Sequence, residues 1–408
     1  MHTPPIPVIE ISGPPRERGR TYGEAARPQI EAALAFYGES FARGSRLDWR
    51  QVTDRARLWV PLVEAFAPDL LEELRGVAEG AGTGLLDLMA LNARGEIVYD
   101  RTFARMGRPP QAPGSESGAD PDPTPTPGPD ADAESDSDSG AADGCSSFAL
   151  LPPAAGDGHV WAGQNWDWRT GAGRTLVALR VVQPPHPTVV MVVEAGQIGR
   201  HGANSAGIAL NANGLGGRFG DEIGVPQTFI RRRILDRANF KDALQVPFSV
   251  HQQIPTNLLF THRDGVSIDL ETTPGRHRWL YPEQGLLVHG NHYQAGVPAQ
   301  LAGSYRPFAV DSLYRVPLIE AALRRARDLR EPEDVRGVIE QALGDHFGLP
   351  HSVCNHPDPH TDPLLQTSTI ASNIVDLTTG EYHVAAGLPC GTPYRPLPWN
   401  IYDGPGGC

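Results

Sequence analysis

The sequence predicts a layered α+β protein whose N-terminal segment is helical. Three observations carry this expectation. Apolar residues recur at helical spacing in the first hundred residues, strand sequences dominate after residue 145, and three helical segments interrupt those strands. Strand runs enclosed by groups of helices are typical of a layered α+β body. A chain of 408 residues is long enough for one large domain or two ordinary ones.

Residues 1–106 are predicted to form the helical segment, which begins with a short strand at residues 8–11. One helix carries an apolar stripe from Ile30 to Phe41 at the i, i+4, i+7 spacing. A second helix begins at Pro68, and a third follows the glycine-rich residues 80–84.

Residues 107–144 are predicted to be a disordered acidic linker rich in Pro, Gly, Ser and Asp. They are almost without apolar side chains and too polar to offset the entropy lost on ordering. Residues 111–144 contain nine Asp or Glu and no Lys or Arg, so they account for −9 of the net charge of −13. The remainder is nearly balanced and offers no basic face, so we expect no nucleic-acid partner.

Residues 145–408 are predicted to form the catalytic core, built from two sheets and the helices that interrupt them. The expected strands are residues 148–151, 159–168, 176–182, 188–194, 207–213, 257–262, 266–271, 286–289, 368–377 and 381–386. The expected helices are residues 227–240, 310–327 and 333–343.

The cysteines and the N-terminus indicate a reducing compartment. Four cysteines, Cys145, Cys354, Cys390 and Cys408, are too few and too scattered for a disulfide framework. The N-terminal residues lack a charged region followed by an apolar one, and no window approaches the ~18 apolar residues of a membrane span. We therefore expect a soluble, cytoplasmic protein without membrane contact, which could form a homo-oligomer.

Cys145 is the candidate nucleophile because it stands between the acidic tract and the first core strand. If the Gly144–Cys145 bond breaks, Cys145 becomes an N-terminal residue that carries a thiol and an α-amine together. A free thiol has a pKa of roughly 8.5 and an α-amine one of about 7.7, so the amine can take the thiol proton near neutral pH. Glycine at position 144 suits self-cleavage, since a residue without Cβ tolerates backbone distortion. The alternative is an ordinary dipeptide with Cys145 buried in a strand.

Asp167 and Asn291 are the candidate partners of this nucleophile. Asp167 lies in a strand about twenty residues after Cys145, far enough for one hairpin to bring it back beside the thiol. Strand alternation places Asn165 and Asp167 on one face, opposite two tryptophans, and the carboxylate could orient the new α-ammonium. Asn291 follows a strand and could donate an N–H to an oxyanion. The alternatives are an aspartate near buried aromatics and an asparagine that caps a turn.

The tract from His351 to His360 invites a metal interpretation, because His and Cys recur within ten residues. A structural zinc site usually shows a second ligand pair elsewhere, and the sequence shows none. We therefore expect no metal ion and no cofactor, and we interpret the tract as a polar loop that faces substrate. A metal-binding hydrolase centred on this tract remains a distant alternative. The sequence lacks a G-x-S-x-G elbow and a phosphate-binding loop, which excludes α/β-hydrolases and P-loop enzymes.

Several stretches together resemble one family, the isopenicillin-N or 6-aminopenicillanic acid acyltransferases. These self-processing N-terminal-nucleophile (Ntn) enzymes also include β-alanyl-dopamine hydrolase-like amidases. No single motif is decisive, but the order and spacing are specific through nearly the whole chain. The stretches are residues 9–13 (IEISG), 18–20, 22–24, 72–82, 91–96, 143–147 (DGCSS), 163–168 (GQNWDW), 194–199, 204–207, 211–213 and 289–292 (HGNH).

The resemblance implies a four-layer αββα proenzyme that cleaves before Cys145 into chains 1–144 and 145–408, which stay associated. Cys145 matches the family nucleophile, Asp167 the acid of the Asn-Trp-Asp motif, and Asn291 the asparagine of the His-x-Asn-His motif. We assign substrate binding to Gln164, Asn165, Asn213, Ser352 and Asn355. Asn355 departs from the family, because many members carry arginine there, which could pair with a substrate carboxylate.

The resulting hypothesis is a self-cleaving cysteine amidase or acyltransferase. It would act on a small-molecule linear amide or thioester through an acyl-enzyme at Cys145. The rival hypothesis is a catalytically silent protein that keeps the fold for binding or as a scaffold.

Overall fold

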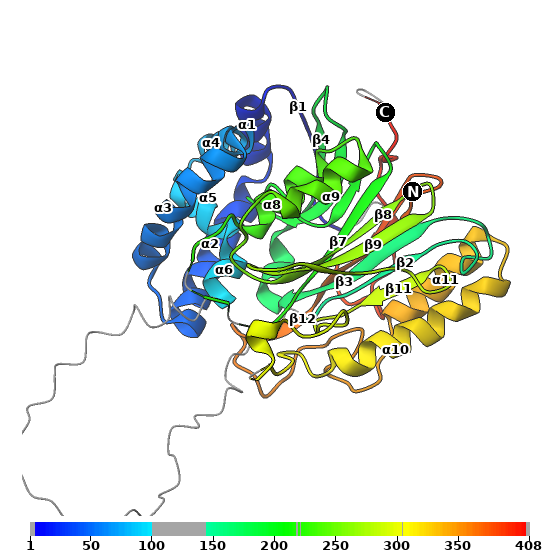
Figure 1. Ribbon diagram of the computed structural model, residues 1–408. Helices are drawn as coiled ribbons and strands as arrows, with labels where there is room; N and C mark the ends of the chain where they lie inside the picture. The colour runs from blue at the N-terminus through cyan, green and yellow to red at the C-terminus, as the bar shows by residue number, and fades with distance from the viewer. Residues whose placement is uncertain (1–4, 100–143, 218, 221, 304, 405–408) are drawn as a thin grey trace, which may run out of the picture.

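Two β-sheets lie face to face between two groups of helices (Figure 1). The structure is a computed structural model that describes residues 5–99, 144–217, 219–220, 222–303 and 305–404. The mixed α+β architecture with two sheets and a helical N-terminal region agrees with the sequence prediction. The expected linker at residues 107–144 falls outside the described residues, apart from Gly144.

The first sheet has eight strands in the order β1-β4-β5-β6-β7-β8-β9-β10. Its first strand pairs in parallel with β4, which lies about 170 residues later in the chain, with Val8 opposite Ala178. All other neighbours in this sheet are antiparallel. The strands are β1 (Val8–Ser12), β4 (Leu176–Val182), β5 (Val189–Glu194), β6 (Gly202–Asn204), β7 (Ile208–Gly214), β8 (Thr256–His262), β9 (Val266–Thr272) and β10 (Arg278–Leu280).

The second sheet has six antiparallel strands in the order β11-β2-β3-β12-β13-β14. Strands β2 and β3 of this sheet are buried along their whole length, because the other sheet covers one face and helices cover the other. The strands are β2 (Ser146–Leu150), β3 (Trp161–Arg169), β11 (Leu286–His289), β12 (Thr367–Asp376), β13 (Glu381–Ala385) and β14 (Arg395–Pro396).

The N-terminal helices lie on the outer side of the eight-stranded sheet, with α8 and α9 beside them (Figure 1). Helices α10 and α11 cover the outer face of the six-stranded sheet. The helices are α1 (Pro15–Ala25), α2 (Arg27–Ser40), α3 (Trp49–Phe66), α4 (Pro68–Ala81), α5 (Leu85–Asn92), α6 (Arg94–Tyr99), α8 (Gln227–Leu235), α9 (Phe240–Phe248), α10 (Ser312–Leu323) and α11 (Pro332–Leu343). Short turns of π-helix (Phe41–Ser45) and 3-10 helix (Thr170–Thr175, Ala299–Leu301 and Arg324–Asp328) lie in the connections between helices and strands.

Glycines let α1 and α4 pack backbone against backbone. A Cβ on Gly19 would lie 2.0 Å from the carbonyl oxygen of Glu73, and one on Gly76 would lie 2.0 Å from that of Arg16. No side chain fits into such a contact, so these positions require glycine for close approach rather than for backbone freedom.

Buried ion pairs join the N-terminal helices to the second half of the chain. Arg232 of α8 binds Glu73 of α4 at 2.8 Å, and Arg18 of α1 binds the other oxygen of Glu73 at 2.6 Å. Arg94 of α6 donates from Nε to Glu194 of β5 at 2.7 Å. Removing one partner of a buried pair typically costs about 3–5 kcal/mol. These contacts therefore hold residues 5–99 firmly on the rest of the body.

Most predicted elements are confirmed, including the N-terminal strand and the helices that begin near Pro68 and Leu85. The helix expected over residues 227–240 is wrong in its extent. The chain leaves the helix after Leu235, and Asn239 begins a second helix by accepting a hydrogen bond from the Lys241 N–H at 2.9 Å. Among the described residues, no helix is long and apolar enough to cross a membrane.

Candidate active site

Cys145 lies directly before β2 and is completely buried. Strand β2 pairs with β3 on one side and with the edge strand β11 on the other, so the cysteine sits at the end of these two ladders of the six-stranded sheet. Its Sγ lies 3.7 Å from the carbonyl oxygen of Asp167. The antiparallel β2–β3 pairing thus returns the chain to Cys145, as the sequence analysis expected.

Asp167 lies on the same face of β3 as Asn165, opposite the tryptophans, as predicted. Asn165 on the same face donates to the carbonyl of Leu343, at the end of α11. Trp168 on the opposite face donates from Nε1 to the hydroxyl of Tyr37 in α2. The buried Asp167 carboxylate accepts a hydrogen bond from the hydroxyl of Thr369 at 2.5 Å through Oδ1. This bond fixes the carboxylate beside the Gly144–Cys145 peptide.

Gly144 packs directly against that carboxylate. A Cβ at this position would lie 2.8 Å from Oδ2 of Asp167 and 3.3 Å from its Cβ. Since Thr369 holds the other oxygen, the aspartate cannot move aside freely.

If the chain cleaves itself as the sequence predicts, Gly144→Ala is expected to slow cleavage because the new methyl group displaces the scissile peptide from Asp167. Strain of about 1.4 kcal/mol in the transition state is enough for a tenfold decrease. The measurement is the rate at which full-length protein converts into two fragments, followed by intact mass. Gly337→Ala in α11 is the matched control, because its Cβ would meet no atom within 4 Å. Equal rates in the two variants would show that Gly144 has no steric role.

Arg315 of α10 organises the region around Cys145, and the sequence analysis did not identify it. Its buried guanidinium donates from Nη1 to the Cys145 carbonyl at 2.9 Å and to the Ser146 hydroxyl at 2.6 Å. Nη2 donates to Oδ1 of Asn291 at 2.8 Å, and Nε donates to Asp311 at 2.6 Å. One side chain therefore connects the candidate nucleophile to the candidate oxyanion donor. A single arginine in an arginine-rich helical segment gives no sequence signal of such a role.

Asn291 lies close to Cys145 through the β2–β11 pairing. His289 stands opposite Ser147 in this ladder, so the chain two residues beyond His289 meets the chain two residues before Ser147. The Asn291 backbone N–H donates to the Ser312 hydroxyl at 2.7 Å, and its Nδ2 donates to the Gly214 carbonyl at 3.0 Å. An amide nitrogen has two protons, so Asn291 can donate one further hydrogen bond.

The side chains of Gln164, Asn165 and Asn213 form hydrogen bonds inside the protein. Gln164 accepts from the Ala212 N–H at 2.9 Å across the two sheets. Asn165 donates to two main-chain carbonyls. The two protons of the Asn213 amide are shared among three acceptors, namely the carbonyls of His289 and Gly290 and the Ser147 hydroxyl. In this structure these amides position the strands around Cys145, and their contact with substrate stays a prediction.

Ser352 and Asn355 lie in the loop between α11 and β12. The Ser352 hydroxyl donates to the Cys354 carbonyl at 2.6 Å. The Asn355 backbone N–H donates to the Thr369 hydroxyl at 3.0 Å, while its carbonyl accepts from the Thr369 N–H at 2.8 Å. This loop therefore supports the threonine that binds Asp167, and its role in substrate binding also stays a prediction.

A buried ionic cluster lies next to this site, between the sheets. His289 of β11 approaches Glu271 of β9 at 3.1 Å and Asp269 at 4.0 Å. Burial alone lowers the pKa of His289, but the two carboxylates outweigh this effect and raise it to about 9. Burial raises the pKa of Asp269 to about 6. Nδ1 of His289 lies 2.9 Å from the Gly290 carbonyl, so both ring nitrogens can donate, as a protonated imidazole requires.

The free energy of unfolding is expected to fall as the pH rises from about 6.5 to about 9. An unfolded histidine loses its proton near pH 6.5, whereas folded His289 keeps it up to about pH 9. The stabilisation is complete below the first value and lost above the second. Urea unfolding at several pH values should show a shallower decline for His289→Gln than for the unchanged protein. Parallel curves would mean that His289 is not charged in the folded state.

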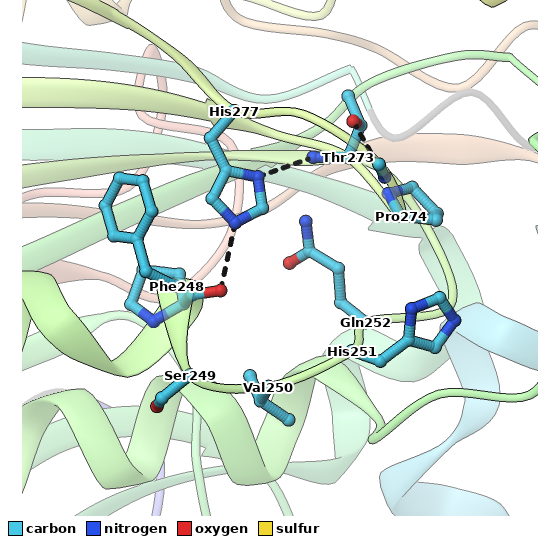
Figure 2. A pocket seen from close by; sticks show the side chains of 10 residues that line it. Phe248, Ser249, Val250, His251, Gln252, Thr273, Pro274 and His277 are labelled. Atoms are coloured by element: carbon cyan, nitrogen blue, oxygen red, sulfur yellow. Dashed lines mark hydrogen bonds between the residues drawn. The ribbon is translucent and has the colours of Figure 1, made fainter.

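A pocket of about 440 Å³ lies elsewhere on the molecule, between residues 247–252 and 273–277 (Figure 2). His277 forms part of its wall, accepting from the Thr273 N–H at 3.4 Å and donating to the Pro247 carbonyl at 2.9 Å. Burial lowers the pKa of His277. None of the residues predicted for catalysis or substrate binding lines this pocket.

Comparison with known proteins identifies relatives of the chain. The family described as acyl-coenzyme A:6-aminopenicillanic acid acyl-transferase matches residues 154–378, more than half of the chain. This segment includes Asp167 and Asn291 and begins shortly after Cys145. The acyl-coenzyme A:6-aminopenicillanic-acid-acyltransferase 40 kDa form of Emericella nidulans is 25% identical over 285 residues, which cover 70% of this chain and 68% of that protein.

Similar solved structures are more distant in sequence. Penicillin V acylase from Agrobacterium tumefaciens has 16% identity and a TM-score of 0.44, and covers 59% of this chain and 83% of its own. A Caenorhabditis elegans N-acylethanolamine-hydrolyzing acid amidase ortholog has 14% identity and a TM-score of 0.38, and covers 57% of this chain and 93% of its own.

Proposed function

Because the chain belongs to the acyl-coenzyme A:6-aminopenicillanic acid acyl-transferase family, we propose that it is a self-cleaving cysteine amidase or acyltransferase with the αββα Ntn fold. The nucleophile is Cys145. The observation that carries this proposal is the arrangement around the Gly144–Cys145 bond. Asp167 lies against Gly144, and Arg315 connects Cys145 to Asn291.

Self-cleavage converts the peptide bond before Cys145 into a thioester. The thiol attacks the carbonyl carbon of Gly144, its proton passes to the departing amide nitrogen, and the peptide C–N bond breaks. Water then hydrolyses the thioester, which leaves a Gly144 carboxylate, a Cys145 thiol and a free α-amine. Arg315 supports this step by holding the Cys145 carbonyl at 2.9 Å, which fixes the residue while its thiol turns toward the preceding carbonyl.

In turnover the α-amine of Cys145 accepts the thiol proton, and the thiolate attacks the acyl carbonyl of the substrate. The resulting α-ammonium forms beside Asp167, whose carboxylate orients it. Asn291 donates the remaining N–H of its amide to the oxyanion, an interaction worth roughly 3–4 kcal/mol when preorganised. The proton then moves to the leaving group, and water or an amine accepts the acyl group.

The two chains stay together after cleavage. Strand β1 belongs to the N-terminal chain and pairs in register with β4 of the C-terminal chain. The pairs Glu73–Arg232 and Arg94–Glu194 also join the two chains, and all four side chains are buried. Separating the chains would expose a strand edge and leave these charges without partners.

The substrate is a small molecule with a linear amide or an acyl thioester. The family name indicates an acyl-coenzyme A donor and 6-aminopenicillanic acid as acceptor. Coenzyme A binding would require a basic recess for its phosphates, and the nearly balanced charge outside the acidic tract favours hydrolysis or amide transfer. Position 355 holds asparagine, which cannot form the ion pair that an arginine would form with a substrate carboxylate. Uncharged N-acyl amines are therefore the preferred candidate substrates.

The rival function is a silent binding or scaffold protein with the same fold. Asp167 and Asn291 are both buried, and both lie close to the buried Cys145. Such a group of polar side chains is typical of a catalytic site and argues against a scaffold, which does not need it.

Intact mass spectrometry followed by an activity panel tests the proposal. Purified protein should separate under denaturing conditions into fragments with the masses of residues 1–144 and 145–408. The cleaved protein should release amine from a panel of N-acyl amines and N-acyl amino acids. An uncleaved chain without thiol-dependent acylation would support the scaffold, and a cut elsewhere would reject Cys145 as the nucleophile.

A further inference from the structure

Four metal-binding side chains from three separate segments meet near the candidate active site. His346 follows α11, Cys354 and His356 lie in the loop before β12, and Cys390 lies between β13 and β14. One ligand atom from each residue lies within 4.8 Å of every other. Cys354 is buried, His356 is half-buried, and the other two are exposed. The sequence shows no second ligand pair beside the tract from His351 to His360 and therefore predicted no zinc, but the fold supplies such a pair as His346 and Cys390.

Three short distances within this cluster share one atom, Nε2 of His356. Nε2 of His356 lies 3.2 Å from Nε2 of His346, 3.6 Å from Sγ of Cys354 and 3.5 Å from Sγ of Cys390. An imidazole nitrogen carries either one proton or one lone pair, so it cannot form three hydrogen bonds at once. Hydrogen bonding alone therefore does not explain the cluster. A cation at its centre does, because each of the four atoms can then direct a lone pair at it.

The spacings also match a tetrahedral zinc centre. With Zn–N bonds of about 2.0 Å and Zn–S bonds of about 2.3 Å, tetrahedral geometry places two nitrogens ~3.3 Å apart and a nitrogen and a sulfur ~3.5 Å apart. The corresponding distances here are 3.2 Å, 3.5 Å and 3.6 Å. Two thiolates and two imidazoles are a common structural zinc set, and they disfavour magnesium and calcium, which take oxygen ligands.

We propose that His346, Cys354, His356 and Cys390 bind one zinc ion in a closed, structural site. All four coordination positions come from the protein, so no position is left for a catalytic water. The backbone around the ligands is already fixed, because the Cys354 N–H donates to the Asp345 carbonyl and the His356 N–H donates to the Pro350 carbonyl. The ion joins the end of α11, the loop before β12 and the β13–β14 connection.

This site stabilises the loop that supports Asp167. Asn355 lies between the two ligands Cys354 and His356, and both of its main-chain groups bond to Thr369. Thr369 in turn donates to the Asp167 carboxylate. Losing the zinc is therefore expected to loosen the Asp167 side of the candidate active site while α10 and Arg315 stay in place.

Metal content tests the proposal without relying on activity. Protein purified without chelators should contain about one zinc ion per chain, measured by inductively coupled plasma mass spectrometry. The variants Cys390→Ser and His346→Ala change exposed residues, so they should fold, and each should lose nearly all of the zinc. His360→Ala is the matched control, since this histidine lies in the same loop but outside the cluster, and it should keep the metal.

Replacement by cobalt provides a second measurement. Co²⁺ in the unchanged protein should give the visible bands of tetrahedral coordination and the near-ultraviolet bands of thiolate ligation, and Cys390→Ser should weaken both. The thermal unfolding temperature should fall after chelation in the unchanged protein but not in Cys390→Ser.

Three results would overturn the proposal. These are reduced protein that binds neither zinc nor cobalt, equal zinc content in the control and the ligand variants, or a Cys354–Cys390 disulfide in protein whose thiols were blocked at lysis. The last result would make the pair a redox site instead of a metal centre.

Discussion

Cys145→Ala is expected to yield a folded chain that stays in one piece and has no amidase activity. The same sulfur performs both the attack on Gly144 and the attack on substrate, so its removal abolishes both steps. The protein should still fold, because Arg315 binds the main-chain carbonyl of Cys145 and the Ser146 hydroxyl rather than the thiol, so the main loss is the packing of one buried sulfur. Intact mass measures cleavage, and circular dichroism with thermal unfolding measures folding.

Cys145→Ser separates the two steps. A hydroxyl can still perform the acyl shift, so slow cleavage is expected, but its much higher pKa should make turnover far slower. Cys408→Ala serves as the control, because this cysteine belongs neither to the candidate active site nor to the proposed zinc site, and cleavage should proceed in it. Normal processing in Cys145→Ala would exclude Cys145 as the agent of cleavage.

Asn291→Ala is expected to lower kcat by roughly 10²–10³ in protein that has been cleaved. The substitution removes the N–H that stabilises the oxyanion, and this charge exists only in the transition state and the tetrahedral intermediate. KM should therefore change little. The measurement is steady-state turnover on the amide panel, with the cleavage state of each preparation checked by mass.

A buried asparagine elsewhere controls for the structural effect of this change. Asn204 donates to the carbonyls of Leu235 and Arg237 at the end of α8. Asn204→Ala should lower the unfolding temperature without lowering kcat in the folded protein. A turnover close to normal in cleaved Asn291→Ala would remove this residue from the oxyanion site, whatever its stability.

Local patterns in the sequence were enough to place most elements and the strand that carries Asp167. Apolar spacing gave α4, α5 and α11, and runs rich in β-branched and apolar residues gave β4 and β12 nearly to the residue. Alternation also assigned Asn165 and Asp167 to one face of β3, because a strand turns each successive side chain to the opposite side. These features depend on neighbours a few positions apart, which a sequence displays directly.

The short strands and the break between α8 and α9 could not be predicted from the sequence. β6 and β10 have three residues each, too few to show a period, and they are strands because neighbouring strands pair with them. No proline or glycine lies between Leu235 and Asn239, and only the cap at Asn239 shows that a second helix begins.

The sequence by itself determined the mixed α+β architecture with two sheets and the face of β3 on which Asp167 stands, and it predicts Gly144–Cys145 as the bond at which the chain cleaves itself. Only the tertiary structure decided that Arg315 connects Cys145 to Asn291, that β1 pairs with β4, and that His346 and Cys390 complete a four-ligand cluster with Cys354 and His356. The physical reason is distance along the chain. Arg315 lies 24 residues from Asn291 and 170 from Cys145, and Val8 pairs with Ala178, so these contacts form only when whole layers pack. A buried arginine and a solvent-facing one look the same in a sequence, and so do a lone histidine and one that will share a metal ion.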